Sequence, residues 1–228
     1  MKERPILFSS PMVRAILDGR KTQTRRVVDV SRLRGGNFDH RGIGAFEWME
    51  NLLWRARAGG WNVWSKPIKC PFGNPGDRLW VRETFANEVQ VEHDQPPPHN
   101  DGRPVWYDDD GLWHQAHYRA TDPAPDLMYE DHPRDEPHCR WMPSIHMPRK
   151  ASRITLEISG VRVERLNDIC ELHAQKEGAP LLSCGYDAKA DLSFASHVKG
   201  FSNLWESING HGSWEKNPWV WVIEFRRL

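Results

Sequence analysis

The sequence has no excess of either charge, since 31 Lys and Arg residues balance 31 Asp and Glu residues among its 228. Proteins that coat nucleic acid electrostatically carry a large positive charge, so the balance disfavours this class of function. The chain also has no apolar run as long as a membrane span or a signal peptide. We therefore expect a soluble, cytoplasmic protein without a membrane partner.

Cysteine is scarce and scattered: Cys70, Cys139, Cys170 and Cys184 have no short paired spacing, which disfavours a disulfide framework or a zinc ribbon. Histidine is more frequent between residues 93 and 138, but its spacing is not typical of metal ligands. These histidines are His93, His99, His114, His117, His132 and His138. The aspartate run at 108–110 is expected to be a solvated turn. We predict no metal and no cofactor.

Charge is unevenly distributed along the chain. Residues 1–34 contain nine Lys and Arg against three Asp and Glu, whereas residues 83–136 contain three against fourteen. Such a dipolar protein would attract an anionic ligand to one face only. Twelve tryptophans are expected mainly in the core, although an aromatic cleft for a base is an alternative.

The basic stretch from residue 19 to residue 26 reads Gly-Arg-Lys-Thr-Gln-Thr-Arg-Arg. A lysine that loses its proton beside an alcohol is the minimum for an activated oxygen nucleophile. The arginines supply fixed positive charge for an oxyanion, a carboxylate or a phosphate. The spacing alone also fits a solvated basic turn, so both interpretations stay open.

A short helix is predicted before this stretch, with Ser10 as its N-cap and Gly19 as a left-handed C-cap. If the stretch continues as a strand, alternate side chains share a face: Thr22, Thr24 and Arg26 on one, and Lys21, Gln23 and Arg25 on the other. Lys21 can then meet Thr24 only if it folds back from the turn.

Apolar periodicity predicts further elements. We expect helices over 45–56, 169–177 and 201–208, strands over 78–85, 152–158 and 219–225, and an irregular segment over 181–200. Glu177 falls in the last turn of its helix, where the helix dipole disfavours a carboxylate, so it is a candidate to exchange a proton near neutral pH, with an ordinary exposed glutamate as the alternative. Arg82 and Glu83 are candidates to line a pocket, though an exposed ion pair would explain them equally well.

Several motifs follow one another in a characteristic order: a helix, Gly-Arg-Lys-Thr-x-Thr-x-Arg, a Gly-Asp-x-Leu-x-Val-Arg strand, a helix ending in Glu-Gly, and a closing apolar strand. This order resembles the ASCH-domain family, over residues 5–28, 76–86, 141–180 and 200–228. The segments Trp-x-Pro-Ser-Ile-His-Met-Pro-Arg and Trp-Val-Trp-Val resemble members encoded in phages and prophages. The resemblance implies an α+β fold, a small PUA-like mixed β-barrel with flanking helices. It implies a single domain over 1–228 with insertions at 29–75 and 87–136.

Amidohydrolases of this family that act on N4-acetylcytidine share the basic stretch and a later His-Ala-x-x-Glu, which here ends at Glu177. The resemblance implies Lys21 as general base, Thr24 as nucleophile, and Glu177 as the carboxyl that tunes Lys21 or shuttles protons. Arg26 would stabilise the oxyanion. The further candidates for substrate binding are Thr22, Arg25, Arg82 and Glu83. The chain departs from these enzymes in its length, more than twice theirs, and in Arg25, where they have isoleucine.

Two other functions stay open. In the first, the protein is an RNA- or nucleotide-binding PUA-like module or a ribonuclease, in which Lys21, Arg25 and Arg26 contact phosphates and tryptophans stack on bases. In the second, it is a phage accessory protein whose acidic 83–136 region binds another protein. The sequence leaves both the true substrate, a modified nucleoside or nucleotide, and the oligomeric state open.

Overall fold

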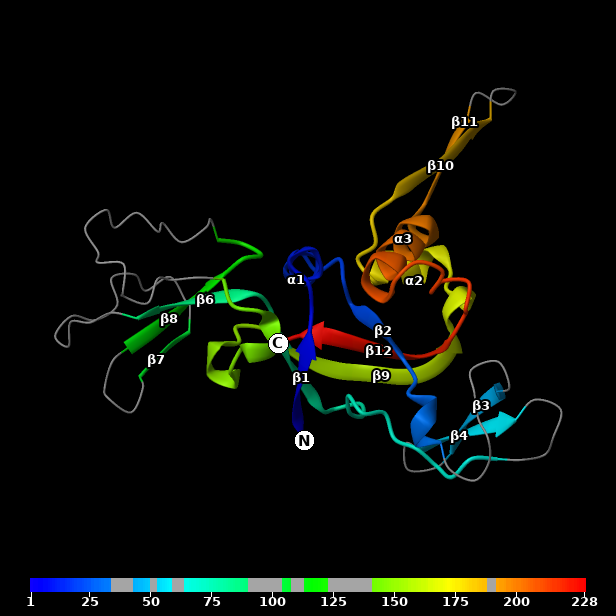
Figure 1. Cartoon of the computed structure of the whole chain (residues 1–228), viewed down its shortest axis with the longest axis horizontal. Coiled ribbons are helices and arrows are strands. Elements are labelled where there is room, and N and C mark those ends of the chain that lie inside the picture. The colour runs from blue at the N-terminus through cyan, green and yellow to red at the C-terminus, as the bar shows by residue number, and fades with distance from the viewer. Residues whose placement is uncertain are drawn as a thin grey trace. The chain divides into compact units, whose positions relative to one another are not determined.

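Three α-helices and several β-sheets make up the part of the chain that the computed structural model describes, so the α+β class is confirmed (Figure 1). The described residues are 1–33, 43–49, 53–58, 64–89, 104–107, 113–122, 141–187 and 192–228. They divide into unit 1 (1–17, 78–156 and 227–228) and unit 2 (18–77 and 157–226). None of the helices in these residues is long and apolar enough to cross a membrane.

Unit 1 contains a parallel strand pair and an antiparallel sheet. β1 (Glu3–Leu7) pairs in parallel with β5 (Arg78–Arg82), and α1 (Ser10–Leu17) buries Val13, Ala15 and Ile16. The antiparallel sheet has the order β6 (Phe85–Val89), β8 (Trp113–Tyr118), β7 (Val105–Tyr107). Two short 3-10 turns, Ser144–His146 and Arg149–Ala151, also belong to the described part of the unit.

Unit 2 is built on β12 (Trp219–Arg227), which lies between β9 (Thr155–Arg165) and the antiparallel β2 (Gln23–Val27). β12 is apolar on both faces, as its sequence predicts, because each face packs against other parts of the unit. Val220 and Val222 join a core cluster with residues of both helices, α2 (Glu171–Lys176) and α3 (His197–Asn209). The alternate residues of β12 lie on its other face. They include Trp221, whose ring centroid is 6.1 Å from that of Trp54.

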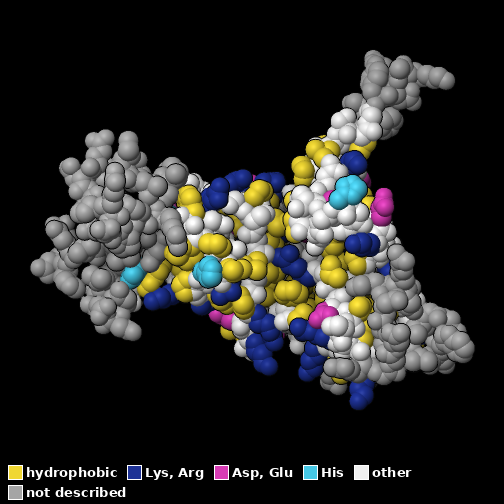
Figure 2. Space-filling view, in the orientation of Figure 1, with side chains coloured by type: hydrophobic (Ala, Val, Ile, Leu, Met, Phe, Trp, Pro, Cys, Tyr) yellow, Lys and Arg dark blue, Asp and Glu magenta, His cyan; other side chains and the backbone are white. Residues whose placement is uncertain are grey.

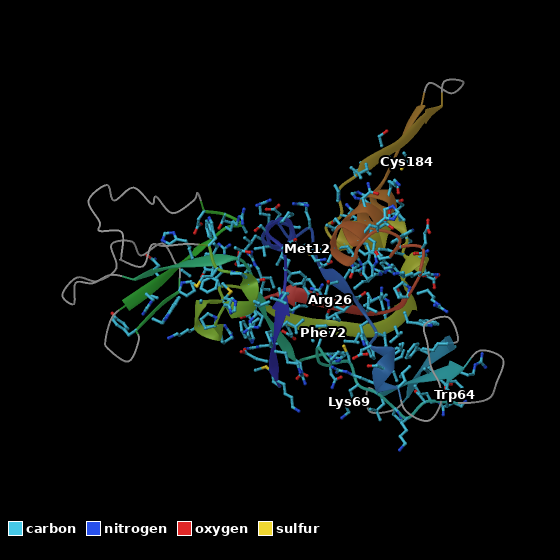
Figure 3. All side chains as sticks on the ribbon, viewed as in Figure 1. Met12, Arg26, Trp64, Lys69, Phe72 and Cys184 are labelled. Carbon is cyan, nitrogen blue, oxygen red and sulfur yellow. The ribbon has the colours of Figure 1, made fainter. Side chains whose placement is uncertain are left out.

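Two predictions of local structure were wrong. Residues 43–58 form a hairpin of β3 (Ile43–Met49) and β4 (Leu53–Ala58) instead of a helix. Their aromatic residues also fit the period of a strand, and packing on β12 decides between the two: Phe46 contacts Trp219 at 5.2 Å. Trp64, labelled in Figure 3, lies against this hairpin with the guanidinium of Arg55 4.0 Å above its ring.

The second correction concerns residues 181–200, which were expected to be irregular. They form the antiparallel pair β10 (Leu182–Asp187) and β11 (Leu192–Ser196) and the start of α3. The hydroxyl of Ser196 accepts a hydrogen bond from the Lys199 amide and so provides an N-cap that the apolar pattern did not reveal. α2 is likewise shorter than predicted, since it spans Glu171–Lys176 rather than residues 169–177.

Candidate active site in unit 2

The backbone brings Lys21 next to Glu177, 156 positions away along the chain. The two residues form an isolated antiparallel bridge, and the Thr22 amide donates to the Lys176 carbonyl at 2.8 Å. The Thr22 carbonyl in turn accepts from the Phe225 amide at 2.9 Å. One short segment before β2 therefore ties the end of α2 to β12.

The turn after α2 fixes the position of Glu177. Glu177 is the C-cap of the helix, and its amide donates to the His173 carbonyl at 3.0 Å. Gly178 follows with a φ of +76°, the left-handed conformation that ends helices and favours glycine. The Glu-Gly pair in the sequence thus marks a real helix end.

The Lys21 side chain is fully buried. Its Nζ donates three hydrogen bonds of 2.8 Å, to the Gln23 carbonyl, the Glu177 carbonyl and Glu177 Oε2. An ammonium group has three N–H donors, so these bonds match its full capacity. Burial lowers the pKa of Lys21, and Arg26 and Arg25 lower it further, while the Glu177 carboxylate opposes the shift.

The Glu177 carboxylate is shared between two cations. Oε2 accepts from Lys21, and Oε1 accepts from Arg25 Nη1 at 3.1 Å, while the side chain is only 3% exposed. The charge of Glu177 also acts on Arg26: burial lowers the pKa of Arg26, and the Glu177 carboxylate opposes this shift. A single buried carboxylate therefore binds Lys21 and Arg25 and also acts on the charge of Arg26.

Arg25 extends this arrangement across the sheet. Its Nη2 donates to Glu164 Oε2 of β9 at 3.1 Å, and Arg162 of the same strand contacts both Glu164 and Glu224. Positive and negative side chains alternate along this row, which we call the charge network: Lys21, Glu177, Arg25, Glu164, Arg162 and Glu224. The network leads from a completely buried amine to Glu224, whose side chain is 38% exposed.

Three polar atoms in or beside the charge network have no hydrogen-bond partner within the described protein. They are Gln23 Oε1, Arg25 Nε and Arg162 Nη2, and all are buried. An unsatisfied buried donor or acceptor costs about 1–3 kcal/mol. Apolar side chains of similar volume would often serve stability as well or better than a buried ionic group. The arrangement is therefore costly for stability, and this favours a functional role.

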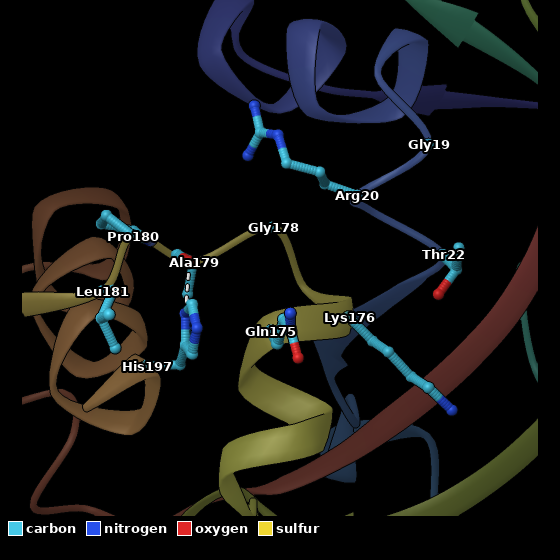
Figure 4. Close-up of a pocket in the computed structure, with 10 residues that line it drawn as sticks. All are labelled: Gly19, Arg20, Thr22, Gln175, Lys176, Gly178, Ala179, Pro180, Leu181 and His197. Atoms are coloured by element: carbon cyan, nitrogen blue, oxygen red, sulfur yellow. Dashed lines mark hydrogen bonds between the residues drawn. The ribbon is translucent and has the colours of Figure 1, made fainter. Parts of the chain in front are cut away.

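A pocket of about 440 Å³ opens beside the Lys21–Glu177 bridge (Figure 4). Its lining includes Thr22 and Gly178, each the next residue after a member of the bridge, and three basic side chains, Arg20, Lys176 and His197. No acidic side chain is among the lining residues. Pockets of this size accept nucleoside-sized ligands.

The wall of this pocket depends on α3. His197 Nδ1 lies 2.9 Å from the Ala179 carbonyl, a contact drawn as a dashed line in Figure 4. Further along α3, a Cβ on Gly200 would lie 1.9 Å from the Pro180 carbonyl oxygen. Only glycine permits this approach, so Gly200 lets the helix support the 178–181 segment directly.

Thr24 and Arg26 lie on the opposite face of β2 from Gln23 and Arg25, in agreement with the predicted alternation, and Thr24 is 2% exposed. Their register partners on β12 are Ile223 and Trp221. The sequence required Lys21 to fold back to Thr24, and its Nζ reaches as far as the carbonyl of Gln23, in the peptide group that leads into Thr24.

The other two predicted binding residues, Arg82 and Glu83, belong to unit 1. Glu83 pairs with Arg153 rather than with Arg82, through two bonds of 3.0 Å, and Arg82 donates to the Met147 carbonyl at 3.1 Å. Both residues thus have structural partners within unit 1. Figure 2 shows more Lys and Arg than Asp and Glu side chains on the visible face of the described residues.

Glu164 and Arg162 were missed by sequence reasoning. Strand alternation from Ile154, Leu156 and Ile158 leads through Gly160 to these even-numbered positions, whereas the strand predicted from its apolar residues ended at 158. Following the strand's period through the glycine, instead of its hydrophobicity, would have found them.

No group of three or more His, Cys, Asp or Glu side chains in the described residues is arranged to hold a metal. His93, His99, His132, His138 and the aspartates 108–110 lie outside those residues. Comparison with known proteins yields no matching family model, no similar curated protein and no similar solved structure. The functional argument therefore depends on the geometry of Lys21, Glu177 and their neighbours.

Proposed function

We propose that the protein is an amidohydrolase that removes an acyl group from a modified nucleoside of the N4-acetylcytidine type. We further propose that it adopts the PUA-like barrel of the ASCH family. One observation carries the proposal: the amine of Lys21 is buried 2.8 Å from Glu177 Oε2, with two arginines nearby and a nucleoside-sized pocket beside the pair. Burial and the arginines lower the pKa of Lys21, which a lysine base requires.

In the proposed mechanism, neutral Lys21 accepts the hydroxyl proton of Thr24 while the Thr24 oxygen attacks the amide carbonyl carbon. Arg26 stabilises the negative oxygen of the tetrahedral intermediate. The C–N bond then breaks, and the leaving exocyclic amine takes the proton from Lys21. A water molecule, deprotonated by Lys21, hydrolyses the Thr24 ester, releasing the carboxylic acid and restoring the hydroxyl.

Glu177 has two roles in this scheme. Its carboxylate stabilises the ammonium form of Lys21 that exists between the two proton transfers, and it fixes the position of the amine. The reaction requires Lys21 to exchange its bond with the Gln23 carbonyl for one with the Thr24 hydroxyl. The Gln23 carbonyl belongs to the peptide group that leads into Thr24, so the two groups are adjacent along β2.

The test is the conversion of N4-acetylcytidine to cytidine, followed by chromatography, for the wild type and for Lys21→Met, Thr24→Val and Glu177→Gln. General-base and nucleophile variants should lose about 10²–10⁴-fold in kcat/KM. Thr24→Ser retains a hydroxyl and should restore part of the activity. Lys199→Met, which replaces an exposed lysine of α3 outside the pocket lining, is the matched control. Equal activity in all five variants, each shown to be folded by circular dichroism, would remove the mechanism.

Nucleotide or RNA binding is the second candidate, because the pocket lining is basic through Arg20, Lys176 and His197. These side chains would contact phosphates, and such binding weakens steeply with added salt. Titration with cytidine 5′-monophosphate and with a short single-stranded RNA at increasing salt tests it. No binding at low salt, or binding that salt leaves unchanged, would exclude this candidate.

A further inference from the structure

We propose that Arg25 and Glu164 are positioning residues for the Lys21–Glu177 pair: Arg25 holds the carboxylate of Glu177 aimed at the amine, and Glu164 holds Arg25. The catalytic consequence of this inference rests on the proposed hydrolase function. Its physical content, the coupling of a β9 carboxylate to a buried lysine, does not.

The geometry of Arg25 carries the inference. The side chain is fully buried, and its two terminal nitrogens bind different carboxylates, Glu177 and Glu164, each at 3.1 Å. The ring of Phe201 on α3 lies 5.8 Å from the guanidinium carbon. A planar guanidinium held at both ends and covered on one side has little freedom to turn, so the orientation of Glu177 depends on Glu164.

Stability alone does not account for this bridge. Arg25 Nε is buried without a partner, and so is Nη2 of Arg162, the cation on the other side of Glu164. A bridge that leaves two charged donors unsatisfied is poorly built as a structural clamp. It does, however, place a positive charge on the opposite oxygen of the same carboxylate that binds Lys21.

Simple electrostatics gives the two residues effects of opposite sign on Lys21. Arg25 lowers the pKa of Lys21, so removing its charge raises that pKa. Glu164 is negative, so removing its charge lowers the pKa of Lys21. The other titratable or charged groups around the pair are unchanged in such variants: Arg26 on β2, His173 on α2, Arg162 on β9 and Glu224 on β12.

The experiment compares Arg25→Met, Glu164→Gln and the control Glu157→Gln in the full chain. Glu157 lies on the same strand at similar exposure, 28% against 23% for Glu164, but pairs with Arg226 outside the charge network. Because neutral Lys21 is the active form, kcat/KM rises with pH through its pKa. Arg25→Met should move this rise upward by roughly one pH unit, Glu164→Gln should move it downward by less, and Glu157→Gln should not move it. Structural damage would lower the rate without opposite shifts.

A second measurement is independent of activity. NMR titration of the lysine side chains, with the Lys21 signal assigned from Lys21→Arg, reports the same shifts whether or not the protein hydrolyses the substrate. Arg25→Lys retains the charge but not the planar fork, so it should leave the pH of the rise in place and lower kcat. Opposite shifts by NMR without hydrolysis would support the coupling and overturn the hydrolase. Hydrolysis with shifts of the same sign, or with none, would overturn the coupling and leave the hydrolase intact.

Discussion

Each unit buries a glutamate against an arginine, but the two carboxylates are held in different ways. In unit 1, Glu83 receives both Nε and Nη2 of Arg153 at 3.0 Å, and the guanidinium lies 3.9 Å above the ring of Tyr118. Arg153 Nη1 donates to Thr121. One carboxylate thus forms two parallel hydrogen bonds with one guanidinium, and the remaining contacts of that guanidinium hold it in place. This is the geometry of a structural ion pair.

In unit 2, the carboxylate of Glu177 is divided between Lys21 and Arg25, and buried donors beside it are unsatisfied. A pocket lies next to this pair. The comparison teaches that burial of an ion pair does not itself indicate function. Three features distinguish the pair in unit 2 from the one in unit 1: a carboxylate that is shared between two cations, buried polar atoms without partners, and an adjacent pocket that can hold a ligand.

The largest effect on stability is expected in unit 1. Glu83→Gln leaves the Arg153 guanidinium without its counter-ion, which should lower the free energy of unfolding by about 3 kcal/mol. The double variant Glu83→Met/Arg153→Met should recover most of this loss, because two apolar side chains replace the whole pair. Urea unfolding measures both variants. If the pair is structural, the folded fraction of Glu83→Gln hydrolyses N4-acetylcytidine at the wild-type rate. A lower rate would mean that Glu83 also serves the reaction and that the two glutamates do not differ in role.

A smaller effect is expected from Gly200→Ala in unit 2. The new Cβ would lie 1.9 Å from the Pro180 carbonyl, so α3 and the pocket wall must separate. We expect a loss of about 1–3 kcal/mol in the free energy of unfolding and a higher KM with kcat nearly unchanged.

Gly160→Ala on β9 is the matched control for this variant. Its Cβ would meet Glu224 Oε2 at 3.1 Å, the end of a flexible side chain that can move. A KM that stays at the wild-type value in Gly200→Ala would show that the 178–181 segment does not shape the substrate pocket.

The elements around the site could be predicted because local signals agree with tertiary packing there. Gly19 and Gly178 both adopt positive φ, and the closing strand at 219–225 is apolar on both faces and buried on both. The motif also indicated that Lys21 and Glu177 belong together, and their side chains do meet.

The remaining parts could not be predicted because only long-range packing decides them. Residues 45–56 satisfy both a helical and a strand period, and aromatic contacts with Trp219 and Trp221 of β12 select the hairpin. The period of the strand can place Glu164 on a face, but its pairing with Arg25, 139 positions away in the sequence, is indicated by no local pattern. Pairing of this kind requires the strand order β9–β12–β2, which the periodicity of single segments does not contain.

The smallest expected effect is on the pH dependence of stability, and it has opposite sign in the two units. Burial raises the pKa of Glu83 above its ordinary 4.5. The contribution of this shift to the free energy of unfolding is therefore fully present below pH 4.5 and is lost as pH rises through the folded-state pKa. The pKa of Lys21 is lowered from 10.5, so its contribution is present above 10.5 and is lost as pH falls through the folded-state pKa. Each slope is at most about 1.4 kcal/mol per pH unit.

Urea unfolding measures the difference in the free energy of unfolding between the wild type and each variant. The difference between the wild type and Glu83→Gln should fall as pH rises from 4.5. The difference between the wild type and Lys21→Met should increase as pH rises to 10.5. Two slopes of the same sign would mean that the buried carboxylate of unit 1 and the buried amine of unit 2 are not held as their contacts indicate.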